Sequence, residues 1–150
     1  MKEKMLRILW LPILVVGVGL TFGGVFAVVE GNNARDDVVA GLVAENIKTS
    51  EDASIPNSPV VDAATARAQA DVIRQHVEER AGGSYAELKK DDPNRETAFK
   101  GAALRTGLML SVLAFGVVDL VVGLGWAFLG LGLVTIIVGV PASYLLVRRN

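Results

Sequence analysis

The chain has 150 residues, of which 51% are hydrophobic and 21% charged, and its mean hydropathy of +0.44 indicates an integral membrane protein. The sequence has no cysteine, which excludes disulfides, thiolate nucleophiles and cysteine-ligated metal sites, and its single histidine, His76, cannot form a two-histidine metal site within one chain. The lack of these ligands means that no cofactor is expected. The net charge of −1 gives no basic surface for nucleic acid, so no nucleic-acid partner is expected either.

The first apolar tract, Ile8–Val29, has 22 residues and no charge. At about 1.5 Å per residue, a helix of this length crosses a hydrocarbon core roughly 30 Å thick. The preceding tail, residues 1–7, carries three bases and one acid. This pattern predicts an uncleaved signal anchor with a cytoplasmic amino terminus. The alternative is a cleavable signal peptide, since Val25-Phe26-Ala27 loosely fits a cleavage site.

The middle segment, residues 30–100, carries 14 acids and 9 bases, a net charge of 9 − 14 = −5. Because basic flanks prefer the cytoplasm and both ends of the chain are basic, we expect this segment to be an extracytoplasmic helical domain. The first helix is expected to continue outward over residues 33–45, where four apolar residues follow helical spacing: Val38, Val39, Leu42 and Val43.

A loop is predicted from Lys48 to Pro59, with a short extended piece at 46–49. Ser58-Pro59 is then expected to open a helix, with serine as the cap and proline at the first helical position. One face of that helix carries small and aliphatic residues in steps of three and four, namely Ala63, Ala66, Ala70, Ile73 and Val77.

Glycines and short polar residues punctuate the rest of the outer domain. Ala81-Gly82-Gly83 is expected to stop the helix. Ser84 can cap a short turn through Leu88, with Glu87 at the position that a capping box requires. Asp92-Pro93 repeats the helix-start pattern, so the last helix is expected to run from there into the membrane.

The second apolar tract runs from Gly107 to Val140 and has Asp119 as its only charge. We expect a long helix over 101–147 that contains the second transmembrane helix at about 120–140, with 101–119 packed on protein or at the lipid interface. Residues 148–150 would form a basic cytoplasmic end. The alternative is three spans, with a break at Gly123-Leu124-Gly125.

Small residues recur on both predicted spans. In the first span the repeat is every four residues, at Gly19, Gly23 and Ala27. In the second span a seven-residue glycine repeat shares its face with Ala127 and Asp119, giving Gly116, Asp119, Gly123, Ala127 and Gly130. Because small residues let helix backbones pack closely in lipid, these two faces are predicted to pack against each other.

Three further residues are candidates for function. An acid in an apolar tract is costly, so Asp119 is a candidate polar contact to Thr21 or to a partner chain. His76 lies beside the alanine-rich face and could make a pH-sensitive contact, although a half-exposed helix residue is the simpler interpretation. Tyr85 is expected to pack in the outer domain rather than to do chemistry.

Several short motifs occur in one order along residues 35–130: Gln69-Ala70-Asp71-Val72-Ile73 with His76, Gly82–Leu88, Asp92-Pro93, Leu104-Arg105-Thr106, Ser111-Val112, Ala114-Phe115-Gly116-Val117 and Gly123-Leu124-Gly125. Together they resemble a family of small two-span actinobacterial membrane proteins of unknown activity, some of which are labelled aromatic ring-opening dioxygenases. The present chain differs in a longer carboxyl end, Trp126–Asn150. A ring-opening dioxygenase needs iron held by two histidines and a carboxylate, and this chain has one histidine. A dioxygenase activity is therefore an alternative that rests only on the label of these relatives.

The sequence therefore predicts a mainly α-helical protein, a transmembrane helical hairpin with a small extracytoplasmic helical domain between the spans. The expected function is that of a non-enzymatic envelope protein, an accessory or scaffold subunit in the cell membrane. Its expected partners are the lipid bilayer and either itself or another membrane protein. Besides the dioxygenase, the remaining alternative is a small proton-linked transport subunit that uses Asp119.

Overall fold

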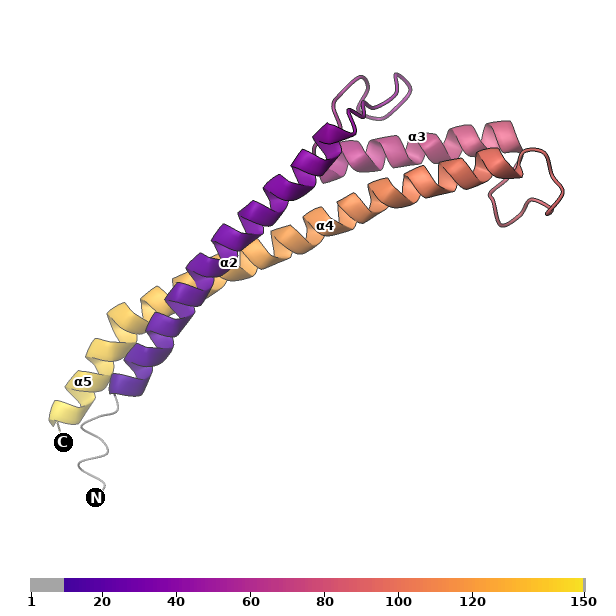
Figure 1. Ribbon diagram of the computed structural model, residues 1–150. Coiled ribbons are helices and arrows are strands. Elements are labelled where there is room, and N and C mark those ends of the chain that lie inside the picture. Colours follow the sequence, from indigo (N-terminus) through magenta and orange to yellow (C-terminus); the bar gives the residue numbers. More distant parts are fainter. Residues whose placement is uncertain (1–9, 150) are drawn as a thin grey trace. The chain divides into compact units, whose positions relative to one another are not determined.

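A computed structural model describes residues 10–149 of the chain, so the predicted tail at residues 1–7 lies outside the described part. The elements are α2 (Trp10–Ala44), α3 (Ala63–Ala81), α4 (Arg95–Val134), the π-helix η1 (Thr135–Gly139) and α5 (Val140–Arg149) (Figure 1). Between residues 10 and 149 the only β pairing is an isolated antiparallel bridge between Lys48 and Pro59. The predicted mainly helical fold is confirmed.

Two helices are long and apolar enough to cross a membrane, Trp10–Ala44 and Arg95–Leu145. Only 11% of the apolar window in each is buried inside the protein, unlike the mostly buried core helix of a soluble domain. Helix α4 runs without interruption through residues 123–125. The break that a three-span arrangement would need is therefore absent from that position.

Past Val134, the long helix changes its hydrogen-bonding pattern just before a proline. The backbone N–H of Val140 donates to the carbonyl of Thr135, five residues earlier, which is the pattern of a π-helix. Pro141 follows and has no N–H to donate, so a regular α-helical ladder could not continue unchanged through this position. The π turn absorbs the irregularity, and α5 then resumes the α-helix.

The described chain forms two compact units. Helices α2 and α4 each contribute one part to the first unit and another part to the second. The first, here called the helix-pair unit, consists of residues 10–33 and 118–149. The second, the three-helix unit, is Ala34–Val117 and contains the end of α2, all of α3 and the start of α4.

The loop between α2 and α3 is folded on itself, and this shifts the start of α3. The N–H of Thr49 donates to the carbonyl of Ser58 at 2.9 Å, and the N–H of Val60 donates to the carbonyl of Ile47 at 3.0 Å. Residues 58–60 are thus held in bridge pairing, and the predicted helix start at Ser58-Pro59 is wrong. Of the extended piece predicted at 46–49, residues 47–49 take part in this pairing, whereas Asn46 lies in a turn with φ 50°.

Helix α3 starts instead at Ala63, with Asp62 as its cap. Oδ1 of Asp62 accepts from the N–H of Thr65 at 2.8 Å, and the Thr65 hydroxyl accepts in return from the N–H of Asp62 at 3.2 Å. This reciprocal capping box satisfies backbone donors that the first helical turn leaves open.

The end of α3 agrees with prediction. Gly82 adopts the left-handed conformation, φ 76°, and its N–H donates to the carbonyl of Glu78. The following segment is a turn in which the Glu87 carboxylate accepts from the N–H of Ser84 at 2.7 Å. Helix α4 begins at Arg95, just after the predicted Asp92-Pro93 start.

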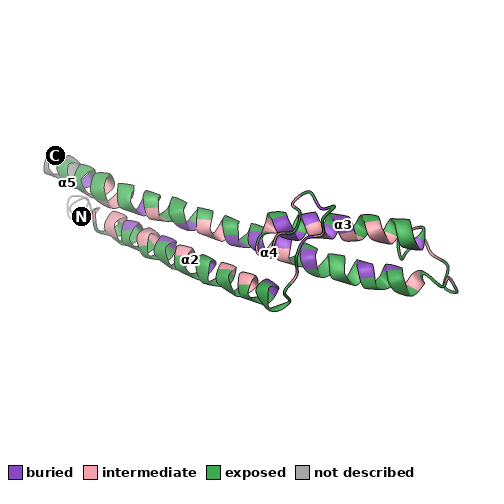
Figure 2. Cartoon of the chain, turned by 90° about the horizontal axis from the view of Figure 1, so that it is seen from above, coloured by how far each residue is buried: buried purple, intermediate pink, exposed green. Residues whose placement is uncertain are grey.

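The three-helix unit has a core of small and aliphatic side chains with one aromatic ring, and it appears in Figure 2 as buried positions on α3 and α4. The predicted alanine-rich face of α3 contributes Ala66 and Ala70, both fully buried. They pack with residues from α2, the loop and α4, namely Leu42, Val60, Leu108, Val112 and Phe115. A second cluster holds the loop on α3 through Ala53, Ala68 and Val72. The start of α4 thus packs on protein.

Candidate functional site

In the helix-pair unit, three glycines of α2 lie against α4. They are Gly17, Gly24 and Gly31, seven residues apart and all buried. A Cβ atom at Gly24 would lie 2.5 Å from the backbone nitrogen of Leu129 and 2.6 Å from the carbonyl oxygen of Gly125. Only glycine permits this backbone approach.

The facing glycines of the long helix repeat at the same interval: Gly125, Gly132 and Gly139. A Cβ at Gly132 would lie 2.6 Å from the backbone nitrogen of Thr21 and 2.7 Å from the carbonyl oxygen of Gly17. Since later residues of α2 contact earlier residues of α4, the two segments run antiparallel. Seven-residue glycine repeats on both sides thus build one continuous close contact.

The predicted packing between the two small-residue faces is wrong. A Cβ at Gly19, Gly23, Gly116, Gly123 or Gly130 would meet nothing within 4 Å, and all five glycines are exposed. Ala127 is exposed as well, and Ala27 is half-buried. Gly123 and Gly125 are two residues apart, about 200° around a helix, so the predicted stripe lies on the other side of α4 from the contact.

Hydroxyl residues on the spans give the sequence signal that distinguishes the two faces. Thr21 and Thr135 lie on the inner faces, half-buried. Each hydroxyl donates to a carbonyl four residues earlier, that of Gly17 at 2.8 Å and that of Leu131 at 2.7 Å. Polar side chains in a membrane helix favour protein-facing positions, so the glycines that share a face with threonine are the packing residues.

Asp119 occupies an exposed position on α4. The suggested bond from Asp119 to Thr21 does not form, because the Thr21 hydroxyl donates to Gly17. Thr21 also lies opposite Gly132, which is 13 residues from Asp119, or about 20 Å of helix.

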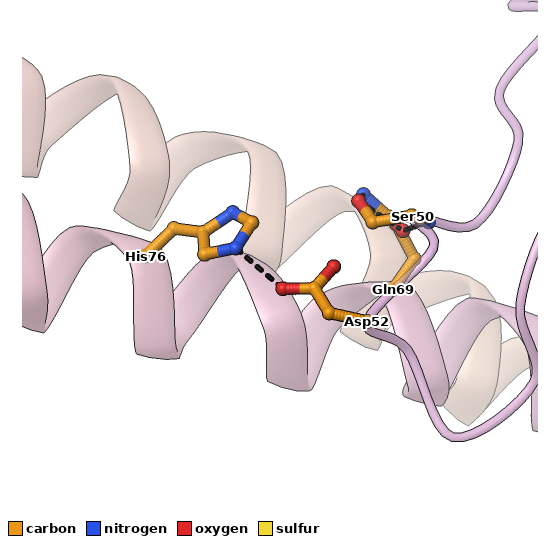
Figure 3. A network of polar contacts seen from close by, with 4 residues as sticks. All are labelled: Ser50, Asp52, Gln69 and His76. Atoms are coloured by element: carbon orange, nitrogen blue, oxygen red, sulfur yellow. Dashed lines mark hydrogen bonds and ion pairs between the residues drawn. The ribbon is translucent and has the colours of Figure 1, made fainter.

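His76 has a partner that the sequence did not reveal. Its Nε2 lies 2.6 Å from Oδ2 of Asp52, a loop residue 24 positions earlier (Figure 3). Beside this pair, the N–H of Ser50 donates to Oε1 of Gln69 at 2.8 Å. Two residues of α3 thus hold the folded loop. Both contacts depend on how the loop folds back onto α3, so the periodicity of the helix could not predict them. The His76 and Asp52 side chains remain 37% and 53% exposed, so their pairing contributes little stability.

Tyr85 packs within the chain beside the start of α4. Its ring centroid lies 4.1 Å from the guanidinium carbon of Arg95 and 5.5 Å from the ring centroid of Phe99. Arg95 also donates to the carbonyls of Tyr85 and Leu88. The cation–π contact and the two hydrogen bonds hold the turn against α4.

Hydrogen bonds lower the pKa of two carboxyl groups in the connecting segments. For Asp62, bonds from the backbone and hydroxyl of Thr65 hold the pKa below its usual value near 3.8. For Glu87, bonds from Ser84 act in the same direction. Both carboxylates are stabilised in their charged form by the turns that they cap, which is a structural role.

An open groove of about 660 Å³ lies within the three-helix unit, between the end of α2 and the start of α4. Its α2 side includes Val38, Gly41 and Leu42, and its α4 side includes Leu104, Gly107 and Leu110. Two carboxylates also line it, Asp37 and Glu45. No sequence pattern indicates this surface, because it depends on how the two helices are juxtaposed.

Over the part of the chain that the structure describes, no group of three or more histidine, cysteine, aspartate or glutamate side chains could hold a metal ion. The chain matches no family model, no curated protein and no solved structure.

Proposed function

We propose that this chain is a non-enzymatic integral membrane protein of the cell envelope, an accessory or scaffold subunit. It crosses the membrane twice as a helical hairpin, with both termini in the cytoplasm and residues 30–100 outside. The outer helical domain is its contact surface for a partner.

This proposal rests mainly on the outward orientation of the large apolar side chains in the helix-pair unit. The contact between α2 and α4 is built on glycine, and the large apolar side chains are turned outward. Phe22, Phe26 and Leu120 are 73%, 66% and 61% exposed. Such a surface would be unstable in water and matches a lipid surrounding, in which helix association depends on close packing rather than on hydrophobicity.

Charge supports the orientation. Bases flank the apolar tracts at both ends of the chain, at Lys2, Lys4, Arg7, Arg148 and Arg149. Lysine and arginine flanks favour the cytoplasmic side. In the helix-pair unit, Gly139 lies against Ile13, so antiparallel packing favours the same side of the membrane for both flanks.

A scaffold role is favoured by what the polar and charged side chains of the three-helix unit do. His76 and Gln69 tie a loop to α3, Arg95 holds a turn, and Asp62 and Glu87 cap backbone segments. Each of these groups makes a contact within its own domain. The open glycines Gly23 and Gly123 leave outward faces on which a second membrane helix could pack.

Cysteine labelling tests the proposal directly, because the natural chain has no cysteine. Ser54→Cys should react with a membrane-impermeant maleimide on intact cells, while Asn150→Cys should react only after lysis. Equal labelling of both positions on intact cells, or protection of Ser54→Cys alone, would contradict the proposed topology.

A further inference from the structure

Two glycines line the groove of the three-helix unit, and packing within the unit does not require either of them. Gly41 and Gly107 lie in the groove within α2 and α4, and a Cβ at either would meet nothing within 4 Å. A glycine inside a helix costs about 1 kcal/mol relative to alanine, yet no intrachain contact requires these two. What they provide is room for another backbone to approach.

One wall of the groove is exposed and apolar. Leu104 and Leu110 line it and are 61% and 59% exposed. Apolar side chains gathered on one surface in water mark a site that binds another molecule.

The opposite wall of the groove carries two acidic side chains. Asp37 lies on α2 and Glu45 directly follows the end of that helix, eight residues later, a separation of about 12 Å or two helical turns. No lysine or arginine is among the described residues that line the groove. Two carboxylates beside the leucines also argue against immersion in hydrocarbon, where a charged side chain costs several kcal/mol.

We propose that this groove docks a helix of another envelope protein, one with an apolar face and lysine or arginine residues two turns apart. The apolar face would cover the leucines, the open glycines would allow close approach, and the basic residues would meet Asp37 and Glu45. This inference rests on the proposed position of residues 30–100 outside the membrane, and it adds the class of partner that the scaffold binds.

A second copy of the chain fits the groove less well. Along the groove-facing side of α4, Lys100 is already paired with Glu96 at 2.7 Å, so that surface has no net positive charge to offer. Two grooves face to face would bring four carboxylates together, and like charges oppose association.

The test uses the full chain in nanodiscs of zwitterionic lipid and a fluorescent helical peptide of leucine and alanine. One version of the peptide carries two lysines two turns apart, and the other carries two glutamates at the same positions. Anisotropy titrations against empty nanodiscs remove binding to lipid. The lysine peptide should bind the natural chain roughly tenfold more tightly than the glutamate peptide.

Two variants sharpen the test. The double variant Asp37→Lys and Glu45→Lys should reverse the preference between the peptides. Gly107→Leu should weaken both peptides by filling the groove, and its fold should be preserved because the site is open. Glu79→Lys, an exposed change on α3 away from the groove, is the control and should change neither affinity.

Equal affinity for both peptides, or a preference that survives the charge reversal, would overturn the proposal in favour of an uncharged apolar occupant such as a lipid chain. If Gly107→Leu instead lowers the oligomeric mass of the chain without affecting the peptide, the occupant is a second copy and the proposal is wrong. Failure of the topology alone is seen separately, as cytoplasmic labelling of Ser54→Cys with the peptide preference intact.

Discussion

The internal packing of the helix-pair unit differs from that of the three-helix unit. In the helix-pair unit the contact consists of glycine backbone, and the bulky side chains point away from it. In the three-helix unit the side chains themselves meet, with Val60 and Phe115 at 1% and 2% exposure. The first arrangement depends mainly on close dispersion contacts, with side chains such as Val122 and Ile136 only half-buried, whereas the second gains more from the hydrophobic effect.

This contrast explains how one continuous α4 can serve both units. Before residue 118 the buried face of the helix carries Leu108, Val112 and Phe115, and after it the inner face carries Gly125 and Gly132. Substitutions that remove bulk should therefore damage one unit, and substitutions that add bulk should damage the other.

The largest expected effect is in the three-helix unit. Phe115→Ala should lower its free energy of unfolding by about 3–5 kcal/mol, because the change leaves a cavity in a packed core. Hydrogen exchange by mass spectrometry should show faster exchange in residues 34–117 and little change in the helix pair. Val117→Ala, two residues away and 52% exposed, is the control; equal effects of the two changes would contradict the assigned core.

The next effect is in the helix pair. Gly24→Ile places side-chain atoms where backbone atoms of Leu129 and Gly125 already lie, and overpacking of this kind costs about 1–3 kcal/mol. The thermal midpoint of the protein in detergent should fall. Gly23→Ile, at the adjacent open position, should leave the midpoint unchanged, and the reverse order of the two variants would show that the outer face makes the contact.

Glycine spacing alone could not predict that result. Gly19 with Gly23 and Gly17 with Gly24 are both regular repeats, and the spacing by itself does not say which pair faces the partner helix. The position of Thr21 beside Gly17 and Gly24 is the signal that does. By contrast, the end of α3 at Gly82 follows from local chemistry and was predictable. The start of α3 was not, because pairing of Lys48 with Pro59 overrides the local preference of Ser58-Pro59 for a helix start. Local sequence patterns thus predict a helix end such as Gly82, where no distant contact competes with them.

A smaller effect is expected at the cap of α3. Asp62→Ala should destabilise the three-helix unit by about 1 kcal/mol at neutral pH. The folded pKa of Asp62 is lowered by hydrogen bonds from Thr65, so its charge contributes stability above the unfolded value near 3.8, and this is lost as the pH falls through the folded pKa. Urea unfolding of both proteins should therefore show a midpoint difference that shrinks in acid; a constant difference would contradict the role of the charge.

The smallest effects concern the loop on α3. Gln69→Ala removes the acceptor for the Ser50 N–H and should cost about 0.5–1.5 kcal/mol. His76→Ala removes a half-exposed contact to Asp52 and should cost about 0.2–1 kcal/mol. Hydrogen exchange of the Ser50 amide should rise more in the first variant than in the second. The opposite ranking would make the histidine the main tie of the loop.

The central claim is that the outward side chains of the helix pair face lipid while the three-helix unit faces water. Trp126, 59% exposed on α4, can report on this by fluorescence after Trp10→Phe leaves it as the only tryptophan. In bilayers of lipids brominated along the acyl chains, its emission should be strongly quenched. In a second protein with Trp10→Phe, Trp126→Phe and Tyr85→Trp, the emission should be quenched by aqueous iodide instead. Quenching of Trp126 by iodide and not by brominated lipid would contradict the account.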